Sequence, residues 1–411
     1  MTQPLWVDTG EAAYPSLTGD IEADIAIVGA GFSGIGAAYA LRDSGAEVII
    51  LEERTVASGA SGRNAGFVLA GPALLFGEAC AQLGTPPARV LWDLTITNNR
   101  LLAELVDEYC LDCGFLRRGS MSLAISRDEM ALLEETAGCL LAAGIDACLV
   151  RATDLPRPFD RLYSGGLYYP GNAEMDPGAF LQGMAARIVE GPVRLYERTP
   201  VVALHSGQVQ TLVTPGGRVR ARKAILATNA YTVRLLPSVP IAPTRGQVLA
   251  TRRLGQVVVP FPMYANYGSE YWRQTPDGRL VVGGWRNLDL ATEIGMEERL
   301  HGDIQQALEA FCFTILGDRV PIERRWAGIM GFTPDLLPLV GEVPGHEGLY
   351  MAVGYSGHGV SMAFTCGILA AHRAAGEDVE IPASLDPARF TLTADDVDAD
   401  LTRSTTRQSR R

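Results

Sequence analysis

Lysine is almost absent from this chain of 411 residues, in which Lys223 is the one lysine among 35 basic residues. Acidic residues number 47, so the net charge is −12 at pH 7. Nucleic acid and anionic membrane surfaces attract basic patches, and this chain has no excess of positive charge to offer them. We therefore expect a solvated acidic surface and no nucleic-acid partner.

Further absences bear on the location of the protein. No run of about 18 apolar residues predicts a membrane span. Residues 1–19 lack the basic start and apolar stretch of a secretory signal. The seven cysteines are scattered and odd in number, which is typical of a reducing cytoplasm. Cys110 and Cys113 form a CxxC spacing, but no second pair completes a zinc site. We expect a cytoplasmic protein without a metal site, in which these are two helix-end cysteines; a redox or metal role is the weaker alternative.

A dinucleotide motif is present once. Residues 29–34 read Gly-Ala-Gly-Phe-Ser-Gly, after an apolar run at 24–28 that is typical of a buried parallel strand. A helical segment follows at 37–41, and 47–52 reads as a second strand that ends in Glu52. Such glycines permit a tight turn, close approach of the backbone to a pyrophosphate, and close packing of helix on strand, while the acid suits ribose hydroxyls. The pattern predicts a dinucleotide site; the alternative is a glycine-rich turn in another kind of α/β protein.

Two other glycine-rich loops are candidates for cofactor contact. Residues 59–66 follow the second strand, and their small side chains let the backbone lie against a flat ring while Arg63 and Asn64 offer hydrogen bonds. Residues 354–359 open the last helix, whose N–H groups favour a group that gains negative charge. The alternatives are a flexible loop for the first and a structural role for His358 in the second.

The chain has no second GxGxxG motif. A reductase that draws electrons from a nicotinamide cofactor usually needs a second nucleotide domain, so we expect electrons to enter directly from a small substrate.

The remaining segments predict two interleaved domains. Helices are expected at 88–113, from Asp176-Pro177 onward, and at 359–375. Strands are expected at 119–125, 201–204, 223–228 and 348–353, and residues 245–285 alternate as in an antiparallel sheet. The expected fold class is α/β, with a Rossmann-like nucleotide domain at 20–75, 170–232 and 320–380 and an antiparallel-sheet substrate domain at 76–169 and 233–319. Residues 393–411 predict a loose polar tail.

Together these segments resemble the D-amino-acid-oxidase-like family of flavin oxidoreductases. The matching pieces include 21–31, Gly59-Ala-Ser-Gly-Arg-Asn64, 226–228, 245–247, 271–280, Thr333-Pro-Asp335 and Gly357-His-Gly359. The resemblance implies an extended FAD under an antiparallel sheet. It also implies oxidation of a C–N bond in a small amine or amino acid by hydride transfer to flavin N5, hydrolysis of the imine, and reoxidation of the flavin by oxygen.

The resemblance also implies roles for individual residues. The expected cofactor-binding residues are Gly29, Gly31, Phe32, Ser33, Gly34, Glu52, Glu53, Ser61, Gly62, Arg63, Asn64, Gly66, Val201, Thr228, Gly328, Gly357, His358, Gly359 and Val360. Tyr271 and Arg273 are the expected catalytic, substrate-side residues, since an Arg fork binds a carboxylate by paired hydrogen bonds. Because strand side chains alternate, one of residues 271–273 faces away from the other two. If Arg273 is structural, the alternatives are Arg245, Tyr267 and Arg286.

The chain departs from the family pattern in three places. Sarcosine oxidases attach FAD through a Cys where this chain has Gly328, so we expect non-covalent FAD. This chain has Ala65 at the third position of the loop that reads Arg-Asn-Gly-Gly in the nearest relatives. The Lys that helps oxygen react in sarcosine oxidases has no counterpart in the strand at 279–283. We expect an oxidase; the alternatives are a dehydrogenase that passes electrons to a quinone or carrier protein, or the flavin subunit of a hetero-complex.

Overall fold

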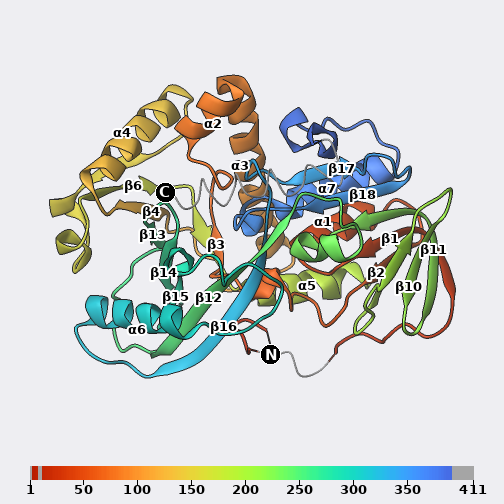
Figure 1. Cartoon of the computed structure of the whole chain (residues 1–411), viewed down its shortest axis with the longest axis horizontal. Coiled ribbons are helices and arrows are strands. Elements are labelled where there is room, and N and C mark those ends of the chain that lie inside the picture. The colour runs from red at the N-terminus through yellow and green to blue at the C-terminus, as the bar shows by residue number, and fades with distance from the viewer. Residues whose placement is uncertain (1, 8–11, 391–411) are drawn as a thin grey trace.

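The computed structural model describes residues 2–7 and 12–390, so the tail expected at 393–411 lies outside the described residues. Figure 1 shows two large β-sheets side by side, with helices around them. One sheet is mostly parallel and the other mostly antiparallel, which confirms the expected mixed α/β fold. No helix in the described ranges is long and apolar enough to span a bilayer.

The mostly parallel sheet has the strand order β17-β18-β11-β1-β2-β8. Its strands are β1 Ile21–Val28, β2 Val48–Leu51, β8 Arg194–Tyr196, β11 Gly217–Leu226, β17 Leu339–Glu342 and β18 Leu349–Val353. Two short strands extend it beside β11: β9 Ala203–His205 and β10 Gln210–Thr214. Every residue of β2 is buried, as expected for a central parallel strand covered on both faces.

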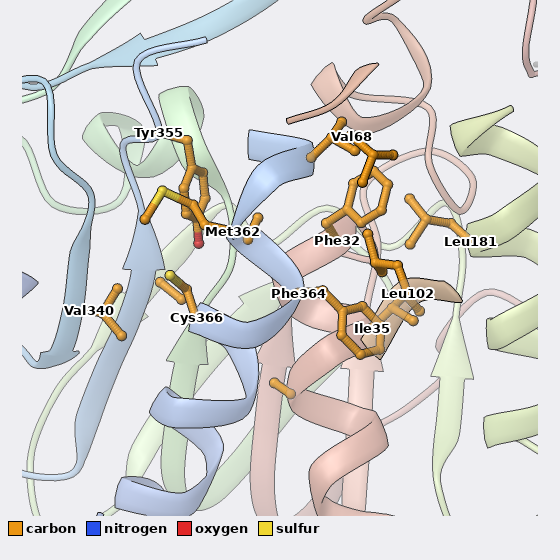
Figure 2. Close-up of a cluster of buried hydrophobic side chains, with 14 of the residues drawn as sticks. Phe32, Ile35, Val68, Leu102, Leu181, Val340, Tyr355, Met362, Phe364 and Cys366 are labelled. Atoms are coloured by element: carbon orange, nitrogen blue, oxygen red, sulfur yellow. The ribbon is translucent and has the colours of Figure 1, made fainter. Parts of the chain in front are cut away.

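Helices α1 Phe32–Leu41 and α7 Ala363–Ala374 cross at very short range. A methyl group on Gly36 would lie 2.2 Å from the Phe364 carbonyl oxygen, and one on Gly367 would lie 2.0 Å from that of Ser33. The buried cluster around this crossing includes Phe32, Ile35 and Phe364, as Figure 2 shows. Helices α3 Thr85–Glu108 and α5 Pro177–Ile188 contribute Leu102 and Leu181 to the same cluster.

The second sheet has the order β16-β12-β15-β14-β13-β4-β6-β5, antiparallel except where β13 meets β4. Its strands are β4 Ser120–Ala124, β5 Cys148–Arg151, β6 Gly165–Tyr169, β12 Ala242–Arg253, β13 Met263–Ala265, β14 Glu270–Gln274, β15 Arg279–Gly284 and β16 Ile322–Phe332. The remaining elements are α2 Phe76–Leu83, α4 Arg127–Ala142, α6 Gly302–Leu316 and the two-stranded ribbon of β3 Phe67–Val68 with β7 Ala173–Glu174.

Some expected boundaries shift for identifiable reasons. The helix expected at 88–113 ends at Glu108, because Cys110 has a positive φ of 50° and cannot continue a helix. The last helix starts at Ala363, and residues 359–361 form a separate 3₁₀ turn. Cys110 and Cys113 form no disulfide and follow the end of α3. Residues 322–332, which the expected division assigned to the nucleotide domain, form β16 of the antiparallel sheet; the division into domains stays a prediction.

The α1–α7 crossing generates a stability prediction. Gly367→Ala places a methyl group against backbone, which has no free space to yield, so we expect a loss of roughly 1–3 kcal/mol in the free energy of unfolding. Gly138→Ala in α4 is the matched control, because nothing lies within 4 Å of its added methyl group. That change should raise stability by about 0.5–1 kcal/mol. Denaturant unfolding of both variants measures this; equal stabilities would contradict the prediction.

Candidate functional site

A cavity of about 560 Å³ lies where the two sheets meet. Its wall includes Val28 and Leu51 at the carboxyl ends of β1 and β2, and Val248 and Tyr271 from the antiparallel sheet. In open α/β sheets, ligands bind outside the carboxyl ends of the strands. The cavity therefore joins a nucleotide-type end to an end formed by the antiparallel sheet.

The glycine turn forms one wall of this cavity. Gly29 and Gly31 line it, as do Phe32 and Ser33 at the start of α1. A methyl group on Gly31 would lie 2.6 Å from Ser61 Oγ, the same hydroxyl that accepts a hydrogen bond from the Phe32 N–H at 3.1 Å. Gly34 lies behind the wall, where a methyl group would come within 1.8 Å of the Gly29 carbonyl oxygen. The turn thus exposes backbone and the helix N-terminus to the cavity, as an anion site requires.

Glu52 closes the next part of the wall at the end of β2. Its carboxylate accepts hydrogen bonds from the Ala30 N–H at 2.8 Å and the Arg54 N–H at 2.9 Å. Burial raises the pKa of Glu52, and these two bonds oppose that effect. Val201 and Thr228 line the cavity on this side, and Glu53 lines it while pairing with Arg234 at 3.5 Å.

The loop at 59–66 uses its polar side chains internally. Arg63 Nε donates to the Ser58 carbonyl at 2.9 Å, and its Nη1 donates to the Ala327 carbonyl at 3.0 Å. Asn64 donates to the Ala60 and Ser61 carbonyls and accepts from the Gly66 N–H. We expected these two side chains to donate hydrogen bonds to a bound ring. They instead hydrogen-bond within the protein and hold the shape of the loop. Ser61, Arg63 and Asn64 line the cavity, whereas Gly62 and Gly66 pack against backbone behind it.

A carboxylate from the antiparallel half ties this loop in place. Glu298 lies 2.9 Å from Arg54 Nη1 and 3.0 Å from Arg63 Nη2. Its side chain is 8% exposed, so both pairs are largely shielded from water. Neither Glu298 nor its role was predicted, because nothing in the sequence near residue 298 distinguishes it from a surface acid.

Glycines also form part of the cavity wall at β12 and β16. Gly328 and Gly246 face each other in the ladder between these strands, and both line the cavity. Gly357, His358, Gly359 and Val360 line it from the loop before α7. Burial lowers the pKa of His358 to about 4, with a further contribution from the nearby charge of Arg286. The imidazole is therefore neutral at pH 7.

Tyrosines dominate the antiparallel end of the cavity, where Tyr264, Tyr267 and Tyr271 form the wall with Arg286. The Tyr271 ring meets Phe67 edge to face at 6.1 Å and covers Gly283, where a methyl group would lie 2.4 Å from the ring. Burial raises the pKa of both Tyr264 and Tyr271 to about 12, so both phenols keep their protons. Tyr264 was not predicted from the sequence, although it is the cross-strand neighbour of Tyr271.

Arg273 does not line the cavity, and its expected role as a substrate ligand needs correction. Its guanidinium is buried between Trp6, the Met175 carbonyl at 2.8 Å and the Glu174 carboxylate at 3.3 Å. Trp272 faces the other side of the sheet and stacks on Phe159. The expectation that one side chain of residues 271–273 faces away from the other two therefore agrees with the structure. The cavity wall includes Tyr271 but does not extend to Arg273.

The three residues expected to replace Arg273 as substrate ligands occupy different positions. Arg245 is buried against Glu293 at 3.2 Å and does not line the cavity, whereas Tyr267 and Arg286 do line it.

The donor set fits an extended dinucleotide that carries a flat ring. Exposed backbone at a helix N-terminus suits a pyrophosphate, Glu52 suits a ribose, and the Gly246–Gly328 pair leaves room for a ring.

Comparisons with known proteins agree with this geometry. A family described as "FAD dependent oxidoreductase" matches residues 24–373. The chain is similar to a probable oxidoreductase, OrdL, from Haemophilus influenzae, with 29% identity over 89% of this chain and 86% of the relative. It is also similar to γ-glutamylputrescine oxidoreductase from Escherichia coli, with 27% identity over 89% of this chain and 87% of the relative. Its fold is similar to the crystal structure of glycine oxidase from Geobacillus kaustophilus, with a TM-score of 0.77 and 23% identity over 91% and 99% of the two chains.

Glu52 generates a prediction about cofactor affinity. Glu52→Gln keeps the shape but removes the charge that strengthens a hydrogen bond from a ribose hydroxyl, which is worth about 1.5–3 kcal/mol. We expect FAD to bind roughly tenfold to a hundredfold more weakly, measured by titrating FAD into the apoprotein.

Glu53→Gln is the matched control, because Glu53 also lines the cavity but pairs with Arg234. A larger loss of affinity in Glu53→Gln than in Glu52→Gln would show that the wrong acid has been assigned.

Proposed function

The chain belongs to the FAD-dependent oxidoreductase family, its cofactor is FAD, and we propose that it oxidises a C–N bond of a small amine or amino acid. The observation that carries this proposal is the single cavity in which the nucleotide turn and Glu52 at one end continue into a tyrosine-lined chamber at the other. The activity named for the relative from Escherichia coli, γ-glutamylputrescine oxidoreductase, supports a nitrogen-containing substrate.

Residues at one end of the cavity would bind the cofactor, and residues at the other end would orient the substrate. When bound, FAD supplies the acceptor for a hydride from the carbon beside nitrogen, and water then hydrolyses the imine that the substrate becomes. Gly29, Gly31 and the start of α1 would hold the pyrophosphate, and Glu52 would hold the ribose. Tyr271 would orient the substrate as a hydrogen-bond donor, since its phenol stays protonated at neutral pH.

We propose that FAD is held without a covalent bond to protein. Gly328 has no side chain to form one, and the ladder brings Gly246 opposite it. Denaturation should release all of the FAD; flavin that stays attached to the protein after acid treatment would contradict this.

Oxygen is the proposed electron acceptor, and a quinone or carrier protein is the second candidate. One observation favours the second: no lysine lines the cavity in the described part of the chain, so the oxygen reaction has no ammonium group to assist it.

Two kinetic measurements test the proposed reaction and its acceptor. Anaerobic bleaching of the flavin by a panel of amines, N-methyl amino acids and D-amino acids tests the oxidation itself. Mixing the reduced enzyme with air in a stopped-flow instrument then tests the acceptor. We expect bleaching by at least one compound and reoxidation in air that is fast enough to support turnover. Bleaching followed by slow reoxidation would instead establish a dehydrogenase.

The same assay with the purified single chain tests the hetero-complex alternative. We expect the chain to turn over by itself. Bound FAD that no compound in the panel bleaches would contradict the proposed reaction.

The electrostatics of the cavity also predict a pH dependence. An amine must be neutral to give up a hydride, and the carboxylates that line the described cavity, Glu52 and Glu53, lie at its nucleotide end. The pKa values of His358, about 4, and of Tyr264 and Tyr271, about 12, are unsuited to taking that proton at neutral pH. We therefore expect the rate of flavin reduction to rise with pH toward the pKa of the substrate ammonium group.

Two substrates whose ammonium pKa values differ test this. The midpoint of the rate profile should move with the substrate. A midpoint that stays fixed for both substrates would show that an enzyme group accepts the proton.

A further inference from the structure

Residues 2–7, which we call the N-terminal strap, pack against the loop at 59–66 from outside the cavity. The strap lies next to β16, at the bottom of the view in Figure 1. It fits closely under the loop, because a methyl group on Gly62 would lie 2.3 Å from Val7 Cγ2. None of the described strap residues lines the cavity, whereas most of the loop does. Any effect of the strap on a bound ligand is therefore transmitted through the loop.

Two indole N–H groups fix the backbone of this loop. Trp6 Nε1 in the strap donates to the Asn64 carbonyl at 2.6 Å. Trp326 Nε1 in β16 donates to the Arg63 carbonyl at 2.9 Å. Neither indole is part of the cavity wall as the described residues form it. The carbonyl oxygens of two consecutive loop residues are thus held on the side away from the cavity.

The planarity of the peptide bond determines where the neighbouring N–H groups point. In a trans peptide, the carbonyl of one residue and the N–H of the next point in opposite directions. The N–H groups of Asn64 and Ala65 therefore point toward the cavity, which both residues line. Neither group has an acceptor among the described residues, although most buried N–H groups have one. Trp6 orients the peptide that carries the second of these two free donors.

The two free donors lie at the part of the cavity that has room for a ring. Gly328 of β16 lies directly on the loop, where a methyl group would come within 3.0 Å of Arg63 Cβ, and Gly246 is its partner in the ladder. Ala65 packs in one cluster with Val248 of β12. A flavin ring carries nitrogen and carbonyl acceptors along its edge, and free N–H groups can donate to these.

Thr2 attaches the strap to the same region at a second point. Its Oγ1 accepts hydrogen bonds from Arg63 Nη1 and from the Ala327 N–H, both at 3.1 Å. Its carbonyl accepts from Arg63 Nη1 at 3.1 Å as well. Ala327 directly precedes Gly328 in β16. Thr2 therefore joins the loop to the strand that lies behind the space for the ring.

The Trp6 side chain is itself held firmly. Its ring lies against the buried Arg273 guanidinium, 4.8 Å from the ring centre. Its carbonyl oxygen lies so close to the start of α5 that a methyl group on Gly178 would come within 2.2 Å of it. Arg273, which does not reach the cavity, thus forms part of the seat that fixes the direction of the indole N–H.

We propose that the N-terminal strap holds the loop at 59–66 in the shape that binds the flavin ring, with Trp6 and Thr2 as positioning residues. The proposal rests on the placement of the flavin ring beside Gly246 and Gly328, and it is independent of the substrate. Without the indole N–H, the peptide between residues 64 and 65 is free to rotate. The binding-competent fraction of the apoprotein then falls, and the apparent affinity falls by the same factor.

The test compares FAD with ADP, which has the ribose and pyrophosphate but lacks the flavin ring. Trp6→Phe keeps an aromatic ring on Arg273 and removes the N–H donor. By titration into the apoprotein, we expect FAD to bind roughly tenfold to a hundredfold more weakly, and ADP to bind within about twofold of the parent. The visible circular dichroism of bound FAD should also change, because the ring loses a fixed donor. Thr2→Val should show the same selective loss to a smaller degree.

The matched control is Trp92→Phe, the same substitution at a buried tryptophan of α3 whose indole N–H has no acceptor among the described residues. It should bind FAD and ADP as the parent does. Equal FAD affinity in the parent and Trp6→Phe would overturn the proposal. Equal losses of FAD and ADP affinity would also overturn it, since they would show general damage. If Trp6→Phe does not fold, the same comparison in Thr2→Val decides.

Flavin reduction separates this proposal from the proposed function. The parent, loaded with FAD, is mixed anaerobically with the amine and amino-acid panel. If no compound bleaches the flavin while Trp6→Phe still loses FAD affinity selectively, the proposed oxidation fails and the role of the strap stands. If the parent is bleached while Trp6→Phe binds FAD as tightly as the parent, the oxidation stands and the role of the strap fails.

Discussion

The approach of α1 to the turn at 29–31 is the constraint on which the nucleotide half of the site depends. Methyl groups at Gly29 and Gly34 would lie 2.8 and 1.8 Å from backbone carbonyl oxygens, so these positions have no room for any side chain, and one at Gly31 would displace the Ser61 hydroxyl at 2.6 Å. With that space free, the helix N-terminus and the end of β2 reach the same wall, and Glu52 can accept from the Ala30 N–H across the turn. The absence of side chains at these glycines therefore determines the geometry of this region.

Charge pairing organises the rest of the cavity. Arg63 is 2% exposed and is tolerated there because carbonyl oxygens and Glu298 satisfy it. Arg273 is tolerated in the same way, by Glu174 and the Met175 carbonyl. A buried charge is costly unless it is paired, and these partners account for the burial of both arginines.

Local patterns in the sequence predicted the nucleotide half well, because its chemistry is contiguous. The strand, turn, helix and acid fall within residues 21–52, and the expected strands and helix all occur there. The antiparallel half was predicted less well. One of residues 271–273 was expected to face away from the other two, and Trp272 does so. Trp6 and Glu174, which lie far away in sequence, cover Arg273. Arg286 lines the cavity directly after Trp285, whose backbone is left-handed. A tryptophan gives no indication in the sequence of such a turn.

The bridge made by Glu298 has a consequence for how much of this protein a cell can keep folded. Glu298 precedes α6 of the antiparallel half, yet it fixes Arg54 and Arg63, which lie beside the cofactor cavity in the nucleotide half. Docking of the two halves and occupancy of the cavity therefore favour each other. By mass action, a ligand at a hundred times its dissociation constant adds about 2.7 kcal/mol to the stability of the state that binds it. FAD binding would then contribute to the stability of the docked arrangement as well as to activity.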